Sequence, residues 1–155
     1  MVLSHRAERE GKLLTFLRGE LGLSSGLVKR LKWQNAFFLD GVPVHTDARV
    51  LPGQKITVKI EEAPEGFLPQ TLPIDILYED ESLIALDKPA GQLVHPSPRK
   101  NDGTLANALL GYYAETNQPC GIHPVTRLDR DTFGVVLLAK NAHIHAKLCQ
   151  IMKDG

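Results

Sequence analysis

The sequence contains few cysteines and no long apolar run. Its two cysteines, Cys120 and Cys149, lie far apart and match no disulfide framework and no CxxC pattern. No apolar stretch approaches the roughly 18–20 residues that cross a membrane. The first residues, 1–12, are polar and lack the apolar stretch of a secretory signal. From these absences we expect no membrane segment and a reducing, cytoplasmic setting.

Motifs for cofactors are absent as well, since the sequence has neither a P-loop nor a GxGxxG pattern. His143, His145 and Cys149 lie close together, but three ligands from one helix rarely close a tetrahedral zinc site. No CxxC or HExxH pattern accompanies them. These patterns therefore favour ordinary surface and core residues over a zinc site, and they give no support for a nucleotide cofactor.

The remaining composition is typical of a globular protein: 155 residues, 43% hydrophobic and 23% charged. That length fits one ordinary domain of about 100–150 residues or two small ones. Residues 1–60 carry ten Lys or Arg against five Asp or Glu, whereas residues 61–82 carry seven acids and no base. The rest has eight bases and six acids, so the net charge is zero. A basic unit followed by an acidic joint indicates two units, the first suited to a polyanion, although a solvated surface would also explain the excess.

Residues 1–60 show the pattern of two helices and a small antiparallel sheet. Apolar residues recur at helical spacing over 13–21, and Gly22 can end that helix. Ser24 or Ser25 can cap a second helix. Its outer surface is basic and is formed by Lys29, Arg30 and Lys32.

A hairpin follows, because Asp40-Gly41 lies between two apolar segments, which is a strong turn signal. Pro43 lacks a backbone donor and predicts an edge strand. Alternation over 56–60 predicts a half-buried strand. Pro, Gly and acidic residues at 61–73 indicate a linker, and a second domain is expected over 74–155. In that domain we expect strands over 74–78, 83–86 and 134–139 and helices capped by Thr104 and Asn141.

The segment RLDRDTFG, residues 127–134, places two arginines and two aspartates in a loop that leads directly into an apolar strand. Loops at strand ends carry function disproportionately. Positive charge beside Asp129 favours its ionised carboxylate, which at the rim of a cleft can act as nucleophile or base. The alternative is a surface loop of ion pairs, with a local turn hydrogen bond from Asp131 or Thr132.

Three segments resemble the RluA/RluD family of pseudouridine synthases, in the order that this family uses. RLDRDTFGVVLLAK, residues 127–140, is similar to the RLDxxTSG motif of its active site. LIALDKPAGQLVHP, residues 83–96, is similar to its VVNKPAGLVVHP segment. Residues 12–60 resemble the α-L RNA-binding domain, found also in a small-subunit ribosomal protein of the S-four type, through GVPV at 41–44 and GQKITV at 53–58.

The resemblance implies an α+β fold, in which a small α-L RNA-binding domain at 1–60 precedes the N-terminal part of a mixed or antiparallel-sheet catalytic domain at 74–155. It implies that Asp129 is the catalytic carboxylate. Arg127 is the arginine that pairs with that aspartate and fills the gap left in RNA when a uridine flips out, and Thr132 fixes the loop geometry. RNA is expected to contact Lys29, Arg30, Lys32, Arg130 and Thr132.

The implied reaction breaks the N1–C1′ bond of uridine, turns the base and rejoins it through C5. Flipping the base out of its stack costs a few kcal/mol, which a cationic side chain in the gap can partly offset. The carboxylate could add to the ribose or the base, or remove a sugar proton, and the sequence leaves these routes open. None of them requires a metal or a cofactor.

Two positions depart from the family pattern: Thr126 stands where the family usually has His, and Phe133 where it has Ser or Thr. The family's catalytic domain also usually continues far beyond this motif, supplying a tyrosine under the target base and a basic residue near the aspartate. We therefore expect the chain to be a fragment, with an open sheet edge and exposed apolar surface.

These observations predict an RNA pseudouridine synthase, an isomerase acting on structured RNA such as ribosomal RNA. The alternative is a non-catalytic RNA-binding or regulatory module, with this chain inactive as a fragment. A structural protein without an RNA role would leave the helix pair, the hairpin and the basic surface unexplained.

Overall fold

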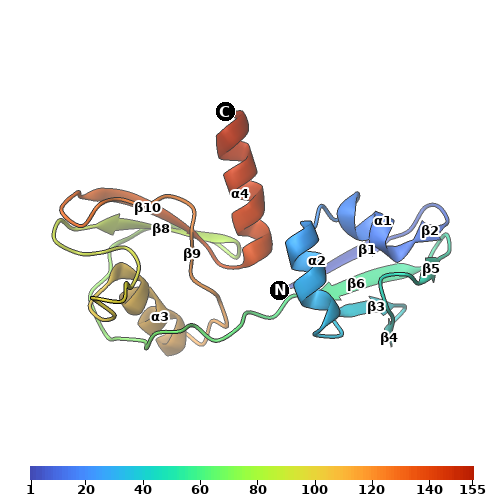
Figure 1. The fold of residues 1–155 in the computed structure, drawn as a ribbon, viewed down its shortest axis with the longest axis horizontal. Helices are drawn as coiled ribbons and strands as arrows, with labels where there is room; N and C mark the ends of the chain where they lie inside the picture. The colour runs from blue at the N-terminus through green and yellow to red at the C-terminus, as the bar shows by residue number, and fades with distance from the viewer. The chain divides into compact units, whose positions relative to one another are not determined.

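The computed structural model describes residues 1–155, which divide into two compact units, Met1–Glu61 and Glu62–Gly155. Each unit combines helices with a four-stranded sheet, and every strand pair is antiparallel (Figure 1). No helix has the length and apolar character needed to cross a membrane.

The first unit packs two short helices on one sheet. The sheet order is β1-β6-β3-β4, and a two-stranded ribbon pairs β2 with β5. The elements are β1 (Val2–Arg6), β2 (Gly11–Lys12), α1 (Leu13–Arg18), α2 (Ser25–Lys32), β3 (Phe37–Leu39), β4 (Val42–Pro43), β5 (Arg49–Val50) and β6 (Lys55–Lys59).

Local sequence explains the main features of this unit. Ser24 caps α2 by accepting a hydrogen bond from the Leu27 amide at 3.2 Å. Asp40 and Gly41 both have positive φ, as the tight hairpin between β3 and β4 requires. β4, which contains Pro43, is an edge strand. The predicted cap, hairpin and edge strand are thus confirmed.

Two details of the first unit differ from expectation. α1 ends at Arg18, one turn before Gly22, because the chain turns at Gly19. Leu21 lies beyond the end of the helix and is nevertheless buried in the core. Residues 2–6, which have no apolar alternation strong enough to predict a strand, form β1 and pair with β6. The strand conformation of this segment comes from its pairing with β6.

The second unit has the sheet order β7-β8-β10-β9 and two helices (Figure 1). Its strands are β7 (Ile76–Glu79), β8 (Leu83–Lys88), β9 (His123–Pro124) and β10 (Gly134–Ala139), and its helices are α3 (Leu105–Glu115) and α4 (Ala142–Asp154). β10 has the predicted bounds. Side chains of α3 pack against the centre of the sheet in one buried cluster, which includes Ile84, Leu86, Leu105, Leu109, Val136 and Leu138.

Both helices of this unit begin at the predicted caps. The hydroxyl of Thr104 accepts from the Asn107 amide at 3.2 Å, and the Asn107 side chain accepts from the Thr104 amide at 3.1 Å. Asn141 caps α4 by accepting from the Ile144 amide at 2.9 Å. Beyond its first turns α4 is largely uncovered, and Ile151 is 66% exposed.

Residues 62–73 form a connecting segment without helix or strand, and it is held on the second unit. Glu62 contacts His123 at 2.7 Å, and the Glu65 carboxylate accepts from the Ile122 amide at 2.9 Å. Gln70 donates its amide to the carbonyl of Asn107 at 3.0 Å. The acidic residues of this segment therefore serve as hydrogen-bond acceptors within the second unit.

The α+β class with antiparallel sheets is confirmed. The identity of residues 1–60 as an α-L RNA-binding domain remains a prediction, as do the domain roles assigned to 61–73 and 74–155.

Candidate active site

The loop that follows β9 and the turn that follows β8 meet at one end of the second sheet. β8 and β10 are antiparallel, and Gly134 at the start of β10 lies opposite Lys88 at the end of β8. Gly134 has a φ of 137°, which side-chain-bearing residues rarely adopt. This register brings the KPAG turn beside the RLDRDT loop, two segments that are far apart in sequence.

The buried side chain of Lys88 connects the KPAG turn to the RLDRDT loop. Its side chain is fully buried, and Nζ donates to the carbonyls of Pro89 (2.9 Å), Gln92 (2.7 Å) and Arg130 (2.9 Å). The Gly91 amide donates to the same Arg130 carbonyl at 2.8 Å. Burial lowers the pKa of Lys88, while the nearby charges of Asp131 and Asp129 act in the opposite direction.

The loop itself is closed by short-range hydrogen bonds. The Thr132 amide donates to the carbonyl of Asp129 at 3.1 Å. Thr126, one of the departures from the family pattern, accepts from the Leu137 amide through its hydroxyl at 2.9 Å and so attaches the start of the loop to β10. Asp129 is thereby fixed through the backbone on both sides, while its carboxylate is solvent-exposed and accepts no hydrogen bond from the protein.

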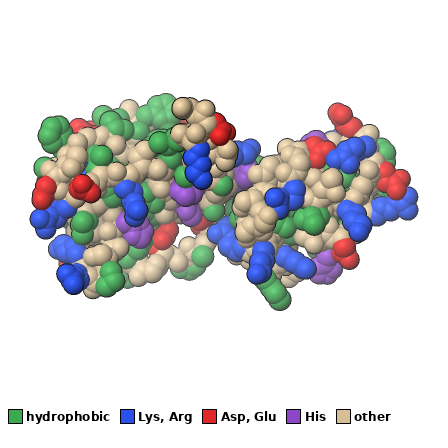
Figure 2. All heavy atoms as spheres, turned by 45° about the horizontal axis from the view of Figure 1, so that its top comes forward, with side chains coloured by type: hydrophobic (Ala, Val, Ile, Leu, Met, Phe, Trp, Pro, Cys, Tyr) green, Lys and Arg blue, Asp and Glu red, His purple; other side chains and the backbone are tan.

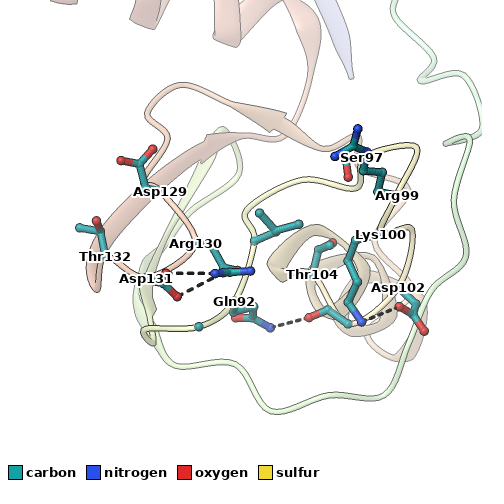
Figure 3. A pocket seen from close by; sticks show the side chains of 13 residues that line it. Gln92, Ser97, Arg99, Lys100, Asp102, Thr104, Asp129, Arg130, Asp131 and Thr132 are labelled. Atoms are coloured by element: carbon teal, nitrogen blue, oxygen red, sulfur yellow. Dashed lines mark hydrogen bonds and ion pairs between the residues drawn. The ribbon is translucent and has the colours of Figure 1, made fainter.

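A hollow of about 780 Å³ lies between this loop and the turn at residues 97–103. Asp129, Asp131 and Thr132 are on one side of it, and Ser97, Arg99 and Lys100 are on the other (Figure 3). The remaining lining residues are Gly91, Gln92, Leu93, Asp102, Gly103, Thr104 and Arg130. The volume is within the range of about 300–1,000 Å³ of small-ligand sites.

Most charges around the hollow are already paired. Arg130 contacts Asp131 at 3.2 Å, and Lys100 contacts Asp102 at 3.0 Å (Figure 3). The hydrogen bond from Arg130 holds the pKa of Asp131 below its usual value. Asp129 and Arg99 form no ion pair, so one free anion and one free cation line the same hollow from different loops.

The structure brings together three of the residues predicted from the RLDRDT segment. Asp129, Arg130 and Thr132 all line the hollow. Arg127 does not line it, and its exposed side chain makes no ion pair with Asp129.

Phe133, the second departure from the family pattern, is 76% exposed. It lines a separate hollow of about 390 Å³ together with Pro73, Ile74 and Lys88. It therefore lies beside the candidate site and contributes no side chain to its lining.

The other predicted RNA-contacting residues belong to α2 in the first unit. Lys29 and Lys32 are exposed, whereas Arg30 is partly buried and its Nε and Nη2 have no hydrogen-bond partner. Trp33 follows directly and is 82% exposed. Figure 2 shows further Lys and Arg side chains distributed over the surface of this unit.

Sequence reasoning missed three contributors to these sites. Lys88 lies in the recognised KPAG segment, but its role depends on a register that only the fold sets. Arg99 lies in a turn without a motif. Trp33 was detectable as the single tryptophan of the sequence, next to the basic residues of a short helix.

The group His143, His145 and Cys149 does not form a cluster suited to a metal ion. His145 Nε2 lies 3.0 Å from the Pro124 carbonyl and 3.5 Å from Cys149 Sγ. His143 is buried, and burial lowers its pKa.

Comparison with known proteins gives consistent matches along the chain. The family model described as RNA pseudouridylate synthase matches residues 82–155. An RNA pseudouridine synthase of Aquifex aeolicus, described as uncharacterized, is 35% identical over 99% of this chain and 51% of its own length. The RNA pseudouridine synthase YjbO of Bacillus subtilis, also described as uncharacterized, is 34% identical over 88% of this chain and 50% of its own length.

A relative with a more specific name is the ribosomal large subunit pseudouridine synthase D of Pseudomonas aeruginosa, which is 40% identical over 71% of this chain and 35% of its own length. The chain thus spans about half the length of the first two relatives. The matched residues 82–155 include both segments that meet at the hollow. By its sequence, this chain belongs to the RluA/RluD family of RNA pseudouridine synthases.

Proposed function

We propose that the protein converts specific uridines of structured RNA to pseudouridine, with Asp129 as the catalytic carboxylate. The observation that carries this proposal is the hollow at the end of the second sheet, where an unpaired Asp129 lies at the rim on a rigidly held loop. The similarity of residues 82–155 to the family supports the same reaction.

The chemistry fits the surroundings of Asp129. The N1–C1′ bond breaks, a C5–C1′ bond forms, C5 loses its hydrogen as a proton, and N1 of the product carries one. An exposed carboxylate without a protein partner is available to attack C1′ or the base, or to take a proton from the sugar. The hollow has room for a nucleotide that has left its stack.

The residues around Asp129 have distinct proposed roles. Lys88 holds the loop by its three carbonyl contacts and is a positioning residue. Arg130 and Thr132 line the hollow and contact RNA. Arg127, which is exposed beside the hollow, fills the gap in the RNA after the uridine has flipped.

The first unit is proposed to be the α-L RNA-binding domain. It presents Lys29, Lys32 and Trp33 on one exposed surface. Lysines bind phosphates without reading sequence, and an exposed indole can stack on a base. The name of the Pseudomonas relative favours large-subunit ribosomal RNA as the substrate.

The deciding experiment measures release of tritium from RNA labelled at uridine C5, using the protein encoded by the complete reading frame that contains these residues. Asp129→Asn should abolish release, which means a loss of at least about 10³-fold for a residue that takes part in bond making, while RNA affinity stays close to that of the unaltered protein. The control is Asp102→Asn, which removes a carboxylate from the same hollow and should retain release.

Retained release in Asp129→Asn would remove this residue from the proposed role. An unaltered protein that folds and binds large-subunit ribosomal RNA but releases no tritium would favour the alternative, a non-catalytic RNA-binding module.

A further inference from the structure

We propose that Arg99 is a phosphate-binding residue that holds the RNA strand across the hollow from Asp129; the proposal rests on the proposed function in assuming an RNA ligand. The residue lies in the turn Ser97–Lys100, on the side of the hollow opposite Asp129 and Thr132 (Figure 3).

The first argument is the charge that remains free. Lys100 and Arg130, the other cations of the hollow, are each within ion-pair distance of a carboxylate. Arg99 has neither an ion pair nor a hydrogen bond within the chain and is exposed. An arginine with five free donors fits a phosphate well, because its planar fork can donate two hydrogen bonds to two oxygens.

The second argument is the rigidity of the turn that carries it. Ser97 and Lys100 exchange backbone hydrogen bonds at 2.8 and 3.0 Å, forming a tight bridge with Arg99 at its tip. Three side chains hold the residues that directly follow this bridge, at 101–103. The Gly103 amide donates to Gln70 Oε1 at 2.6 Å, Gln92 donates to the Gly103 carbonyl at 3.2 Å, and Asn107 donates to the Asn101 carbonyl at 3.3 Å.

Such anchoring lowers the entropic cost of ordering the turn when a ligand binds. A free cation on a preformed turn and a free carboxylate on the opposite side of a hollow of about 780 Å³ suit a ligand with one anionic and one reactive part. A nucleotide has this character: its phosphate would contact Arg99 while its sugar and base lie toward Asp129.

The test is RNA binding by the full chain, measured by fluorescence anisotropy with a fluorescein-labelled RNA hairpin whose loop is oligouridine. Arg99→Ala should weaken binding about tenfold, the low end for a hydrogen bond to a charged group. It should also reduce the slope of log Kd against log salt by about 0.7–0.9, the contribution of one phosphate contact. Arg99→Lys, which keeps the charge, should recover most of the slope.

Two matched variants control for general loss of charge. Lys153→Ala removes a positive charge from α4, away from the hollow, and should bind as the unaltered chain does. Lys100→Ala alters the neighbouring residue of the same turn, and its effect should be smaller than that of Arg99→Ala because Lys100 is paired with Asp102. Thermal unfolding of each variant identifies any that are misfolded.

An Arg99→Ala chain with the salt slope of Lys153→Ala would overturn the proposal, and so would a folded unaltered chain that does not bind the hairpin. Because the assay measures binding alone, its result is separable from the proposed function. Retained tritium release in Asp129→Asn, with the Arg99 effect on binding intact, would contradict the catalytic role of Asp129 only. Normal release with unaltered binding by Arg99→Ala would contradict the present proposal only.

Discussion

Tyr112 and Tyr113 are neighbours on α3 whose hydroxyls have opposite surroundings. The Tyr112 hydroxyl donates to Glu79 at 2.7 Å, and Glu79 also accepts from Lys140 and Gln118. The Tyr113 hydroxyl is buried and has no hydrogen-bond partner. Burial would raise the pKa of Glu79, but these three donors together outweigh it and leave the pKa below its usual value.

The same substitution should therefore have different effects at the two positions. Tyr113→Phe removes an unsatisfied hydroxyl and should leave the free energy of unfolding unchanged or raise it by up to about 1 kcal/mol. Tyr112→Phe removes a bond to a carboxylate and should lower it by about 1–2 kcal/mol at pH 7. Chemical denaturation of both variants measures the difference.

The effect of Tyr112→Phe should depend on pH in one direction. Because the folded-state pKa of Glu79 is lowered, its bonds stabilise the fold above the unfolded value of 4.5 and are lost as the pH falls through the folded value. The stability difference between Tyr112→Phe and the unaltered chain should shrink between pH 5 and pH 3. A difference that grows on acidification would contradict this account of Glu79.

At the scale of elements, the connecting segment and α3 approach each other closely at one glycine. A Cβ atom on Gly111 would overlap the Gln70 carbonyl oxygen. Gln70 in turn accepts from the Gly103 amide, at the end of the turn that carries Arg99. The backbone of Gln70 thus packs closely on α3 at Gly111, and its side chain binds one side of the candidate site.

Gly111→Ala should accordingly lower the free energy of unfolding by about 1–3 kcal/mol, since the Gln70 backbone must move to make room. The control is Gly26→Ala in α2, where the added methyl group meets nothing within 4 Å and should be neutral or stabilise by up to about 1 kcal/mol. Thermal unfolding of the two variants compares them, and equal effects would contradict the close approach.

Element boundaries show where sequence reasoning was sufficient. The helix caps Ser24, Thr104 and Asn141 and the hairpin at Asp40-Gly41 were predictable because each acts through hydrogen bonds or dihedral angles within a few residues. β1 was not predictable, because its strand state comes from pairing with β6, whose partner residues are 49 to 57 positions away.

At the scale of the whole molecule, each unit has its own buried core, and each contains one part of the proposed RNA interface. The surface in the first unit is that of α2, with Lys29 and Lys32 and the single tryptophan, Trp33. An 82% exposed indole beside two lysines gives an intrinsic fluorescence signal for RNA binding by this unit.

Addition of the RNA hairpin should quench Trp33 fluorescence as the indole stacks on a base. The double variant Lys29→Ala/Lys32→Ala should reduce the salt slope by about 1.4–1.8, the contribution of two phosphate contacts, and weaken binding accordingly. The matched control, Lys147→Ala/Lys153→Ala on α4, should change neither quantity. Fluorescence that does not respond to RNA, in a chain that binds it by anisotropy, would contradict this surface.

The candidate site was predictable in part. Asp129, Arg130 and Thr132 come from one short segment, so their proximity followed from the sequence, and all three line the hollow. The positions of Arg127 outside the hollow and of Arg99 within it were not predictable. They depend on the path of the loop after β9 and on which turn the fold places on the other side of the hollow.

The α+β class, the local caps and turns, and the membership of the family follow from residue patterns that are contiguous along the chain. The composition of the site, in contrast, depends on the packing of distant segments. The antiparallel register of β8 and β10 buries Lys88 beneath the loop of Asp129, and the packing of Gln70 on α3 holds the turn of Arg99 across the hollow. Contacts between segments distant in sequence carry no local signal, since they arise when the sheet pairs and the core closes.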